Sequence, residues 1–307
     1  MKSVAVTSRS FSKHPMLREE LSKKYQRVTF NDAGKTLSDE ALIDFLQDHD
    51  MAIIGLERMH ADILKQLPKL KVISRFGVGL DTLDIVTMKT LGIKLAYTRG
   101  ANKRAVSELV IGLAINMLRQ LPFSNHELLT GIWRQNKGRQ LSGKTIGIIG
   151  LGEIGKDLVS LLRVFDCKIY AFDVSDQTDF CRAHQIKQVD LDSLLSVADV
   201  VTLHIPLNSA TRLLLNEQRL SLMKPSAILI NAARGGLVDE QALKLMLQNN
   251  RLAGAAFDVY ETEPPVDKEL LSLPNFFATP HIGGSTEEAI LAMGQAAITG
   301  LETAECL

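Results

Sequence analysis

A glycine-rich turn between an apolar run and a helical pattern limits the folds open to this chain. The sequence GLGEIG at residues 150–155 follows the apolar run 145–149 and opens the helical pattern 154–165. Gly150 permits a tight turn, Gly152 lets the backbone approach a phosphate, and Gly155 lets the helix pack closely on the strand. The first N–H groups of that helix then face an anion. The pattern predicts a dinucleotide site on a parallel α/β sheet.

An acidic residue after the next strand indicates which dinucleotide the site would bind. Asp173 follows the next apolar run, 168–172, and lies 18 residues after Gly155. Its carboxylate would accept hydrogen bonds from both hydroxyls of a ribose. A 2′-phosphate would be repelled there, and residues 174–176 contain no Arg or Lys to bind one. We therefore predict NAD rather than NADP, with FAD and S-adenosyl ligands as alternatives.

Short apolar runs alternate with longer helical patterns along the chain, which is typical of parallel sheets covered by helices. We expect an α/β fold with two Rossmann-like domains, each built on a doubly wound parallel sheet. The expected strands are 4–7, 51–54, 72–74, 93–96, 145–149, 168–172, 200–203, 227–230 and 254–257.

Three further segments carry structural signals. Residues 101–120 show one apolar face at helical spacing, and we expect this helix to bridge two domains. The polar segment 124–142 is expected to be a boundary or an arm. The closing stretch 285–304 begins Ser-Thr-Glu-Glu, where Ser285 and Glu288 predict a capping box at the start of a terminal helix.

Composition excludes several classes of protein. The chain has 307 residues, with 35 Lys and Arg against 35 Asp and Glu, so a net charge of zero argues against a nucleic-acid-binding surface. No apolar run is long enough for a signal peptide or a membrane span. Three cysteines, Cys167, Cys181 and Cys306, suggest neither a disulfide framework nor a metal site. We expect a soluble cytoplasmic protein, with no regulatory domain after the closing helix.

Three polar residues that follow expected strands are candidates for chemistry. Arg234 lies in NAARGG, Glu263 in ETEPP and His281 in TPHIGG. A single Arg, Glu or His of this kind more often has a structural role, and it is the combination of the three that indicates an active site. Because the carboxyl ends of parallel strands meet at one edge of a sheet, we expect these side chains to share a site.

The motifs, in order, resemble those of the D-isomer-specific 2-hydroxyacid dehydrogenases, a family that includes phosphoglycerate, glycerate and D-lactate dehydrogenases. The resemblance covers nearly the whole chain. It is carried by the segments 76–81, 100–102, 107–109, 150–155, 204–207, 231–239, 257–259 and 280–285.

The resemblance implies a division of the chain. Residues 1–97 plus 282–307 would form a flavodoxin-like outer domain that binds substrate. Residues 98–281 would form an NAD-binding Rossmann domain, in which an arm at about 101–142 makes a homodimer.

The resemblance also implies roles for single residues. His281 would be the general acid in reduction and the base in oxidation, and Glu263 would hold its imidazole and raise its pKa. Arg234 would bind the carboxylate and carbonyl of the substrate. The backbone N–H groups of Val78 and Gly79 would complete the carboxylate site.

Further contacts follow from the same resemblance. A purely structural role remains an alternative for both His204 and Asp258. The implied cofactor contacts are Gly150, Gly152, Glu153, Ile154, Gly155, Asp173, His204, Pro206, Thr211, Ala232, Arg234, Asp258, His281 and Gly283. The implied substrate contacts are Arg75, Val78, Gly79, Asn102, Arg234 and His281.

The predicted function is an NAD-dependent oxidoreductase that interconverts a D-2-hydroxyacid and its 2-oxoacid, with a phosphoglycerate-like or a hydroxypyruvate-like substrate as the two alternatives. Arg75 could bind a second anionic group such as a phosphate, or form a surface ion pair. The segment 54–57 lacks the second arginine of phosphate-binding members, which argues against phosphoglycerate, and glutamate rather than glutamine at 263 argues against formate dehydrogenase. The alternatives are an NAD(H)-sensing protein similar to corepressors and an enzyme similar to S-adenosylhomocysteine hydrolase.

Overall fold

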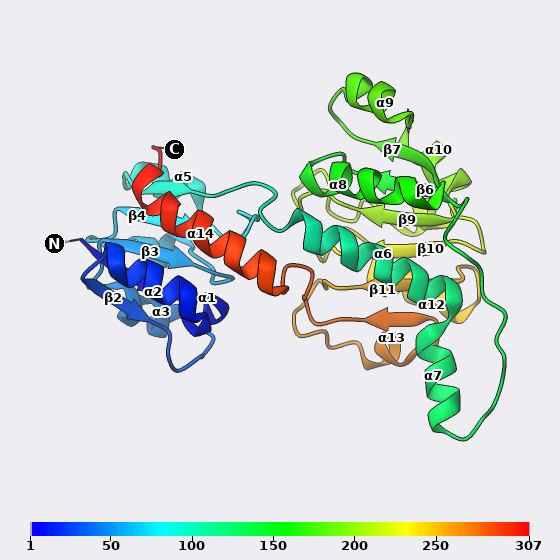
Figure 1. Cartoon of the computed structure of the whole chain (residues 1–307), viewed down its shortest axis with the longest axis horizontal. Coiled ribbons are helices and arrows are strands. Elements are labelled where there is room, and N and C mark those ends of the chain that lie inside the picture. Colours follow the sequence, from blue (N-terminus) through cyan, green and yellow to red (C-terminus); the bar gives the residue numbers. More distant parts are fainter. Residues whose placement is uncertain (1, 307) are drawn as a thin grey trace. The chain divides into compact units, whose positions relative to one another are not determined.

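The computed structural model describes residues 2–306 and divides the chain into two compact units (Figure 1). Unit 1 comprises the chain up to Asn102 and again from Gly284 onward, and unit 2 comprises Lys103–Gly283. The sequence places these boundaries at residues 97/98 and 281/282, a few residues earlier. The first boundary coincides with the start of helix α6 (Lys103–Arg119), because the chain remains outside that helix as far as Asn102.

Unit 1 is built on a five-stranded parallel sheet in the order β2-β1-β3-β4-β5. This is the flavodoxin-like order, in which the direction of winding reverses between β1 and β3. The central strands β1 and β3 are buried along their whole length, which explains why they read as unbroken apolar runs. The strands are β1 Ser3–Val6, β2 Arg27–Phe30, β3 Met51–Ile54, β4 Val72–Arg75 and β5 Lys94–Ala96.

Helices cover both faces of this sheet. Figure 1 shows α1 (Arg9–Lys13), α2 (Pro15–Lys24) and α14 (Glu287–Thr303) together on one face. The other face is covered by α3 (Asp39–Leu46), α4 (Ala61–Leu64) and α5 (Ile85–Thr90), whose leucines, isoleucines and methionines form one buried cluster with the sheet.

Unit 2 is built on a seven-stranded parallel sheet in the order β12-β11-β10-β9-β6-β7-β8. Read from β8, the order is 3-2-1-4-5-6-7, which is the Rossmann order with one added strand. The expected fold class, α/β with two doubly wound parallel sheets, is confirmed. The strands are β6 Thr145–Ile149, β7 Lys168–Phe172, β8 Lys187–Gln188, β9 Val200–Leu203, β10 Ile228–Asn231, β11 Gly254–Phe257 and β12 Phe276–Ala278.

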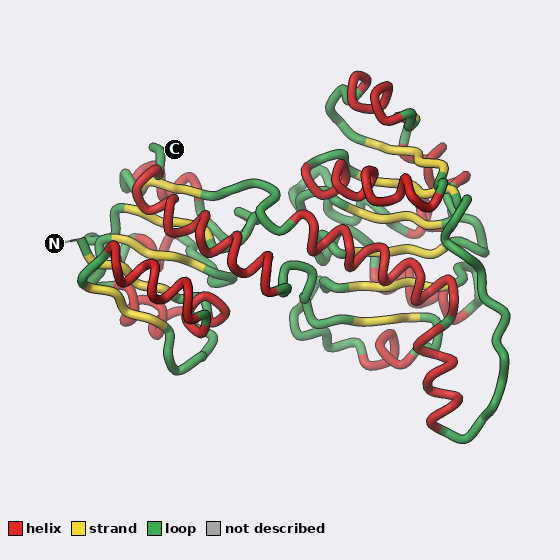
Figure 2. The backbone as a smooth tube through the Cα atoms, in the orientation of Figure 1, coloured by secondary structure: helices red, strands yellow, loops and turns green. Residues whose placement is uncertain are grey.

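The helices of unit 2 lie on both faces of its sheet. One buried cluster joins the sheet to α6 and α8, and a second joins it to α10, α11 and α12. Figure 2 shows the long loop 130–144 between α7 and β6. The remaining bounds are α7 Leu121–Leu129, α8 Glu153–Leu162, the 3-10 helix η1 Arg163–Phe165, α9 Thr178–His184, α10 Leu191–Val197, α11 Glu217–Leu220, α12 Glu240–Gln248 and α13 Lys268–Ser272.

Three expectations from the sequence need correction. The strands β2, β8 and β12 were not expected; all three lie at sheet edges, where partial exposure weakens the apolar pattern. The polar segment 124–142 is helical in its first part, since α7 extends to Leu129. Helix α14 is capped by Thr286, whose side chain accepts from the N–H of Ala289, and not by Ser285.

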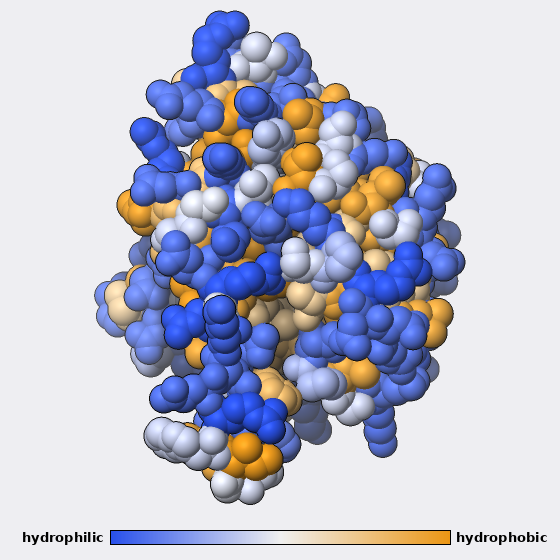
Figure 3. Space-filling model, turned by 90° about the vertical axis from the view of Figure 1, so that its right-hand side faces the viewer, coloured by the Kyte–Doolittle hydropathy of each residue, from blue (hydrophilic) through white to orange (hydrophobic). Residues whose placement is uncertain are grey.

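The surface drawn in Figure 3 is mostly hydrophilic, with apolar side chains scattered over it. Among residues 2–306, no helix has both the length and the apolar character needed to cross a membrane. The same residues contain no cluster of three or more His, Cys, Asp or Glu side chains suited to a metal ion.

Candidate active site

The glycine turn has the geometry that a dinucleotide requires. Gly150 has φ +103°, and a Cβ there would lie 2.6 Å from the carbonyl oxygen of His204. A Cβ on Gly155 would collide with the carbonyl oxygen of Gly150. A Cβ on Gly152 would meet only open space, so the backbone at that position is accessible to a ligand at the start of α8.

Asp173 is held beside this turn. Its Oδ2 accepts a hydrogen bond of 2.7 Å from the N–H of Leu151, and its Oδ1 accepts one of 2.8 Å from the N–H of Ser175. A carboxylate oxygen can accept more than one hydrogen bond, so both oxygens keep capacity for ribose hydroxyls. The residues present therefore fit a dinucleotide that carries no 2′-phosphate.

The other cofactor candidates of unit 2 lie beyond the carboxyl ends of four neighbouring strands. This is the edge at which ligands of open α/β sheets bind. His204, Pro206 and Thr211 follow β9, Ala232 follows β10, Asp258 follows β11 and Gly283 follows β12. Glu153 and Ile154 begin α8, where Glu153 pairs with Lys103 at 3.1 Å.

His204 is a neutral histidine. Burial lowers its pKa to about 4, and its Nε2 lies 3.0 Å from the hydroxyl of Thr202. Its buried Nδ1 has no hydrogen-bond partner among the described residues. These features suit packing or lining of a ligand site better than proton transfer near neutral pH.

His281 and Glu263 form a direct pair. The Nδ1 atom of His281 lies 2.8 Å from Oε2 of Glu263, and both side chains are about one-third exposed. The other carboxylate oxygen of Glu263 accepts from the N–H of Tyr260 at 3.2 Å. Because Nδ1 faces the carboxylate, Nε2 is the nitrogen left to act on a bound molecule.

The two partners shift each other's pKa. The hydrogen bond to Glu263 raises the pKa of His281, with burial opposing it and the charges of Glu263 and Asp258 adding to it. Burial acts to raise the pKa of Glu263, but the hydrogen bond and charge of His281 outweigh it, helped by the Tyr260 N–H and the charge of Arg234, so this pKa is lowered. The pair therefore favours a charged imidazole beside a charged carboxylate.

Asp258 holds the turn that presents His281. Its Oδ1 accepts from the Thr279 hydroxyl at 2.6 Å and the Ile282 N–H at 2.7 Å, and its Oδ2 accepts from the Gly283 N–H at 2.8 Å. His281 has φ +54°, a left-handed conformation that costs free energy in a non-glycine residue. The buried carboxylate thus fixes a strained turn.

The backbone of the loop that carries Arg234 is held by Asn231, a residue that was not among the predicted site residues. Asn231, the last residue of β10, is buried; its Nδ2 donates to the carbonyl of Arg234 at 2.8 Å, and its Oδ1 accepts from the Ala233 N–H at 3.1 Å. The sequence feature that could have identified Asn231 is a polar residue at the end of an otherwise apolar strand. Gly235 packs this loop against the backbone of Tyr260, where a Cβ would collide with the carbonyl oxygen of Tyr260.

The four candidates in unit 1 lie between the last residue of β4 and the start of α6. Arg75, the last residue of β4, is only 4% exposed, so its guanidinium lies inside the fold and not at the surface, where one of the two alternatives placed it. Val78 and Gly79 lie in the half-buried loop that follows, and their N–H groups make no hydrogen bond within the described chain. The buried Oδ1 of Asn102 likewise accepts no hydrogen bond there.

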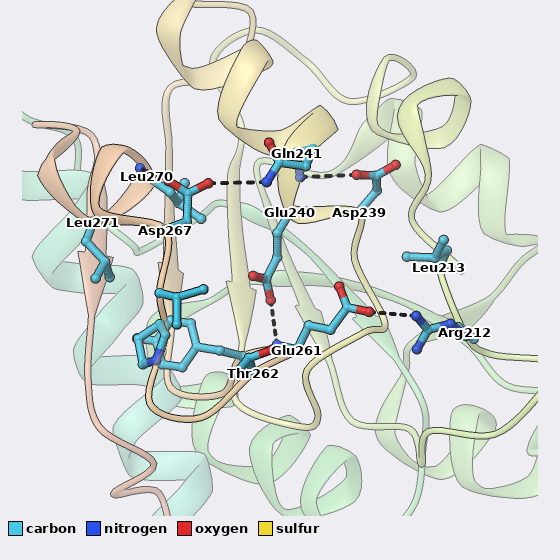
Figure 4. Close-up of a pocket in the computed structure, with 13 residues that line it drawn as sticks. Arg212, Leu213, Asp239, Glu240, Gln241, Glu261, Thr262, Asp267, Leu270 and Leu271 are labelled. Atoms are coloured by element: carbon cyan, nitrogen blue, oxygen red, sulfur yellow. Dashed lines mark hydrogen bonds and ion pairs between the residues drawn. The ribbon is translucent and has the colours of Figure 1, made fainter.

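A cavity of about 310 Å³ is lined by residues after β9 and β11 and by the start of α12, including Arg212, Glu240 and Glu261 (Figure 4). Two of its acidic side chains make polar contacts. The Glu240 carboxylate accepts a hydrogen bond from the backbone N–H of Glu261 at 2.8 Å, and the Glu261 carboxylate pairs with Arg212 at 2.6 Å. Burial raises the pKa of Glu240. Arg234, Glu263 and His281 do not line this cavity.

Comparisons with known proteins agree with this arrangement. Residues 111–283 match the family described as D-isomer specific 2-hydroxyacid dehydrogenase, NAD binding domain. The chain is 36% identical over 282 residues to D-3-phosphoglycerate dehydrogenase of Methanocaldococcus jannaschii, covering 91% of this chain and 54% of that protein. It is 37% identical over 265 residues to hydroxypyruvate reductase of Thermotoga maritima, covering 84% and 85%.

A solved structure of a D-2-hydroxyacid dehydrogenase is also similar to this chain. The structure of D-2-hydroxyisocaproate dehydrogenase matches with a TM-score of 0.85 and 26% identity, covering 98% of this chain and 96% of that one. The chain spans only about half the length of the phosphoglycerate dehydrogenase relative, whereas it spans most of the length of the hydroxypyruvate reductase relative.

Proposed function

This chain belongs to the D-isomer specific 2-hydroxyacid dehydrogenase family, and from that premise we propose that it is an NAD-dependent oxidoreductase that interconverts a D-2-hydroxyacid and its 2-oxoacid. The observation that carries the proposal is the pair His281–Glu263, 2.8 Å apart, on the edge of the sheet that also carries the glycine turn. A proton donor and a dinucleotide fold are the two parts that this reaction needs.

The cofactor would be held by the turn 150–155 and by Asp173. When bound, NAD supplies the acceptor or donor of the hydride. The open backbone at Gly152 and the helix that follows suit a pyrophosphate, and the fixed carboxylate of Asp173 suits a ribose with both hydroxyls free. That carboxylate also favours NAD over NADP, because a 2′-phosphate would meet a like charge.

His281 would move the proton. In reduction, Nε2 would donate a proton to the oxo oxygen of the substrate, and in oxidation it would accept one from the hydroxyl. Glu263 would keep Nδ1 protonated and orient the ring, since their hydrogen bond raises the pKa of His281. Asp258 would hold the turn that presents the ring.

Arg234 and two backbone N–H groups would bind the substrate carboxylate. A guanidinium offers a fixed positive charge and paired donors, which orient a carboxylate and stabilise negative charge that develops on a carbonyl oxygen. Val78 and Gly79 contribute N–H groups that make no hydrogen bond within the described chain. Arg75 and Asn102 are proposed as further contacts in unit 1.

We further propose a hydroxypyruvate-like substrate and a homodimer. The name of the Thermotoga maritima relative, hydroxypyruvate reductase, supports the first. The second is supported by exposed apolar side chains gathered on α7 and the loop after it, which a second copy of the chain would cover. These side chains are Leu121, Leu128, Leu129, Ile132 and Trp133.

The proposal is tested by following NADH absorbance with a panel of 2-oxoacids: hydroxypyruvate, glyoxylate, pyruvate, phosphohydroxypyruvate, and branched and aromatic acids. We expect turnover with at least one acid, and a loss of about 100- to 10,000-fold in kcat for His281→Ala, because the general acid is removed. His60→Ala, which changes an exposed histidine of unit 1, serves as the matched control.

A binding measurement separates the enzyme from an NAD(H) sensor. NADH fluorescence titration should show that His281→Ala still binds NADH, since the turn 150–155 and Asp173, which would hold the cofactor, are unchanged. Tight NADH binding without turnover of any acid would contradict the proposal and favour the sensor. Full activity in His281→Ala would contradict the role given to that residue.

A further inference from the structure

The sheet of unit 1 has a ligand edge of its own. In its strand order, β2-β1-β3-β4-β5, the winding reverses between β1 and β3. In open α/β sheets the loops after the strands on either side of this reversal separate, and ligands bind outside the carboxyl ends of the strands there. The residues that follow β1 and β3 are Thr7 and Gly55.

A carboxylate lies across that reversal. Glu57 reaches back from the loop after β3, and its Oε2 accepts from the hydroxyl of Thr7 at 2.7 Å and from the N–H of Gly55 at 2.8 Å. Thr7 and Gly55 are both buried, so these two bonds fix the position of the carboxylate. Its other oxygen, Oε1, makes no hydrogen bond with the described part of the chain and is not buried.

The same edge carries the substrate residues proposed in unit 1. Strand β3 pairs with β4 so that Ile54 lies opposite Arg75, and the N–H of Phe76 donates to the carbonyl of Ile54 at 2.9 Å. The loop with Val78 and Gly79 begins directly after this point. The loop that holds Glu57 and the loop proposed to bind the substrate carboxylate therefore follow neighbouring strands, at the same edge of the sheet.

The guanidinium of Arg75 and the carboxylate of Glu57 both lie on this edge, and they differ in their exposure to solvent. Arg75 is 4% exposed, whereas Glu57 is half-buried with one oxygen open to solvent. The cations Arg9, the first residue of α1, and Arg58, which follows Glu57, are exposed. Of these charged groups, it is the carboxylate of Glu57 that is fixed at the reversal point by hydrogen bonds to the residues that follow β1 and β3.

From this geometry we infer that Glu57 is a specificity-determining residue, which selects 2-oxoacids with a distal hydroxyl and rejects those with a distal phosphate or carboxylate. The inference rests on the proposed function and names the substrate class of the same site. A carboxylate oxygen accepts a hydrogen bond from a hydroxyl, but it repels a phosphate at the same position.

The test compares kcat/KM for three 2-oxoacids that differ only at the distal carbon: hydroxypyruvate, phosphohydroxypyruvate and pyruvate. For the unmodified protein, we expect hydroxypyruvate to be favoured over phosphohydroxypyruvate by at least about 100-fold, since placing like charges together is strongly unfavourable. Glu57→Gln keeps the size of the side chain and an oxygen for Thr7 and Gly55, so the fold of the loop is retained.

In Glu57→Gln we expect the preference for hydroxypyruvate over phosphohydroxypyruvate to fall by about tenfold or more, mainly through a lower KM for phosphohydroxypyruvate. The kcat/KM for pyruvate should change much less than that for phosphohydroxypyruvate, because pyruvate has no distal group. Glu40→Gln is the matched control: it removes the same charge from an exposed position of unit 1 and should leave all three values unchanged.

The outcomes separate this inference from the proposed function. An unchanged preference in an active Glu57→Gln enzyme, or an unmodified protein that prefers phosphohydroxypyruvate, overturns the role of Glu57 alone. Equal changes in Glu57→Gln and Glu40→Gln would reduce the effect to net charge and also overturn it. Absence of turnover with every acid, while NADH binds, overturns the proposed function and this inference together.

Discussion

At the scale of the residue, the pair Glu263–His281 determines how the proposed activity depends on pH. Reduction needs a protonated His281, and the hydrogen bond to Glu263 raises its pKa. The kcat/KM for reduction should therefore fall as pH rises through this raised pKa. In Glu263→Gln the charged partner is lost, so we expect the fall to occur at lower pH, and activity at neutral pH to drop by about tenfold or more.

Steady-state rates measured across the titration range of histidine check this prediction. Glu217→Gln is a suitable control, because it removes an exposed carboxylate elsewhere in unit 2. A decline that stays at the same pH in Glu263→Gln would show that another group titrates. A loss of activity that is equal at every pH would assign Glu263 to ring orientation alone.

At the scale of the element, helix α14 shows how tertiary context selects a cap. Its N-terminal sequence offers two hydroxyl residues in succession, and the structure uses Thr286, whose side chain accepts from the Ala289 N–H at 3.1 Å. We expect Thr286→Ala to lower the free energy of unfolding by about 1 kcal/mol, because an N–H of the first turn loses its partner. Urea unfolding measures this change.

Ser285→Ala supplies the internal comparison for that helix. Because Ser285 lies outside the cap, its substitution should change the free energy of unfolding by less than about 0.5 kcal/mol. A larger cost for Ser285→Ala than for Thr286→Ala would mean that the capping box expected from the sequence, and not the observed cap, stabilises the helix.

At the scale of the whole molecule, the arm formed by α7 and the loop after it tests the proposed homodimer. Trp133 is 82% exposed, and large aromatic side chains supply much of the binding free energy of interfaces. We expect the unmodified protein to sediment as a dimer, and Trp133→Glu to weaken that dimer by about 30-fold or more. Sedimentation over a range of concentrations gives the dissociation constants.

Val164→Glu is the matched control for the arm. Val164 has the same exposed fraction, 82%, but lies in η1. It should leave the dimer intact, since the arm carries the proposed interface. Equal dissociation by both variants would point to a general effect of added charge, and a monomeric unmodified protein would contradict the homodimer.

Local patterns in the sequence were sufficient for much of the fold. The strands at 51–54, 145–149, 168–172, 200–203 and 254–257 agree with the structure to the residue. Three of them, 51–54, 200–203 and 254–257, are buried along their whole length, and strands buried on both faces are rich in apolar residues. The glycine turn and the NAD-binding family were also evident. The edge strands β2, β8 and β12 were missed, since their partly exposed residues carry a weaker pattern.

The sequence by itself determined the fold class, the cofactor class and the candidates Arg234, Glu263 and His281, because these depend on short motifs whose residues are neighbours in the chain. Only the tertiary structure decided that Arg75 is buried and that Glu57 reaches Thr7, 50 residues away. Such contacts arise when strands distant in sequence become neighbours in a sheet, and no local pattern records which side chains then meet.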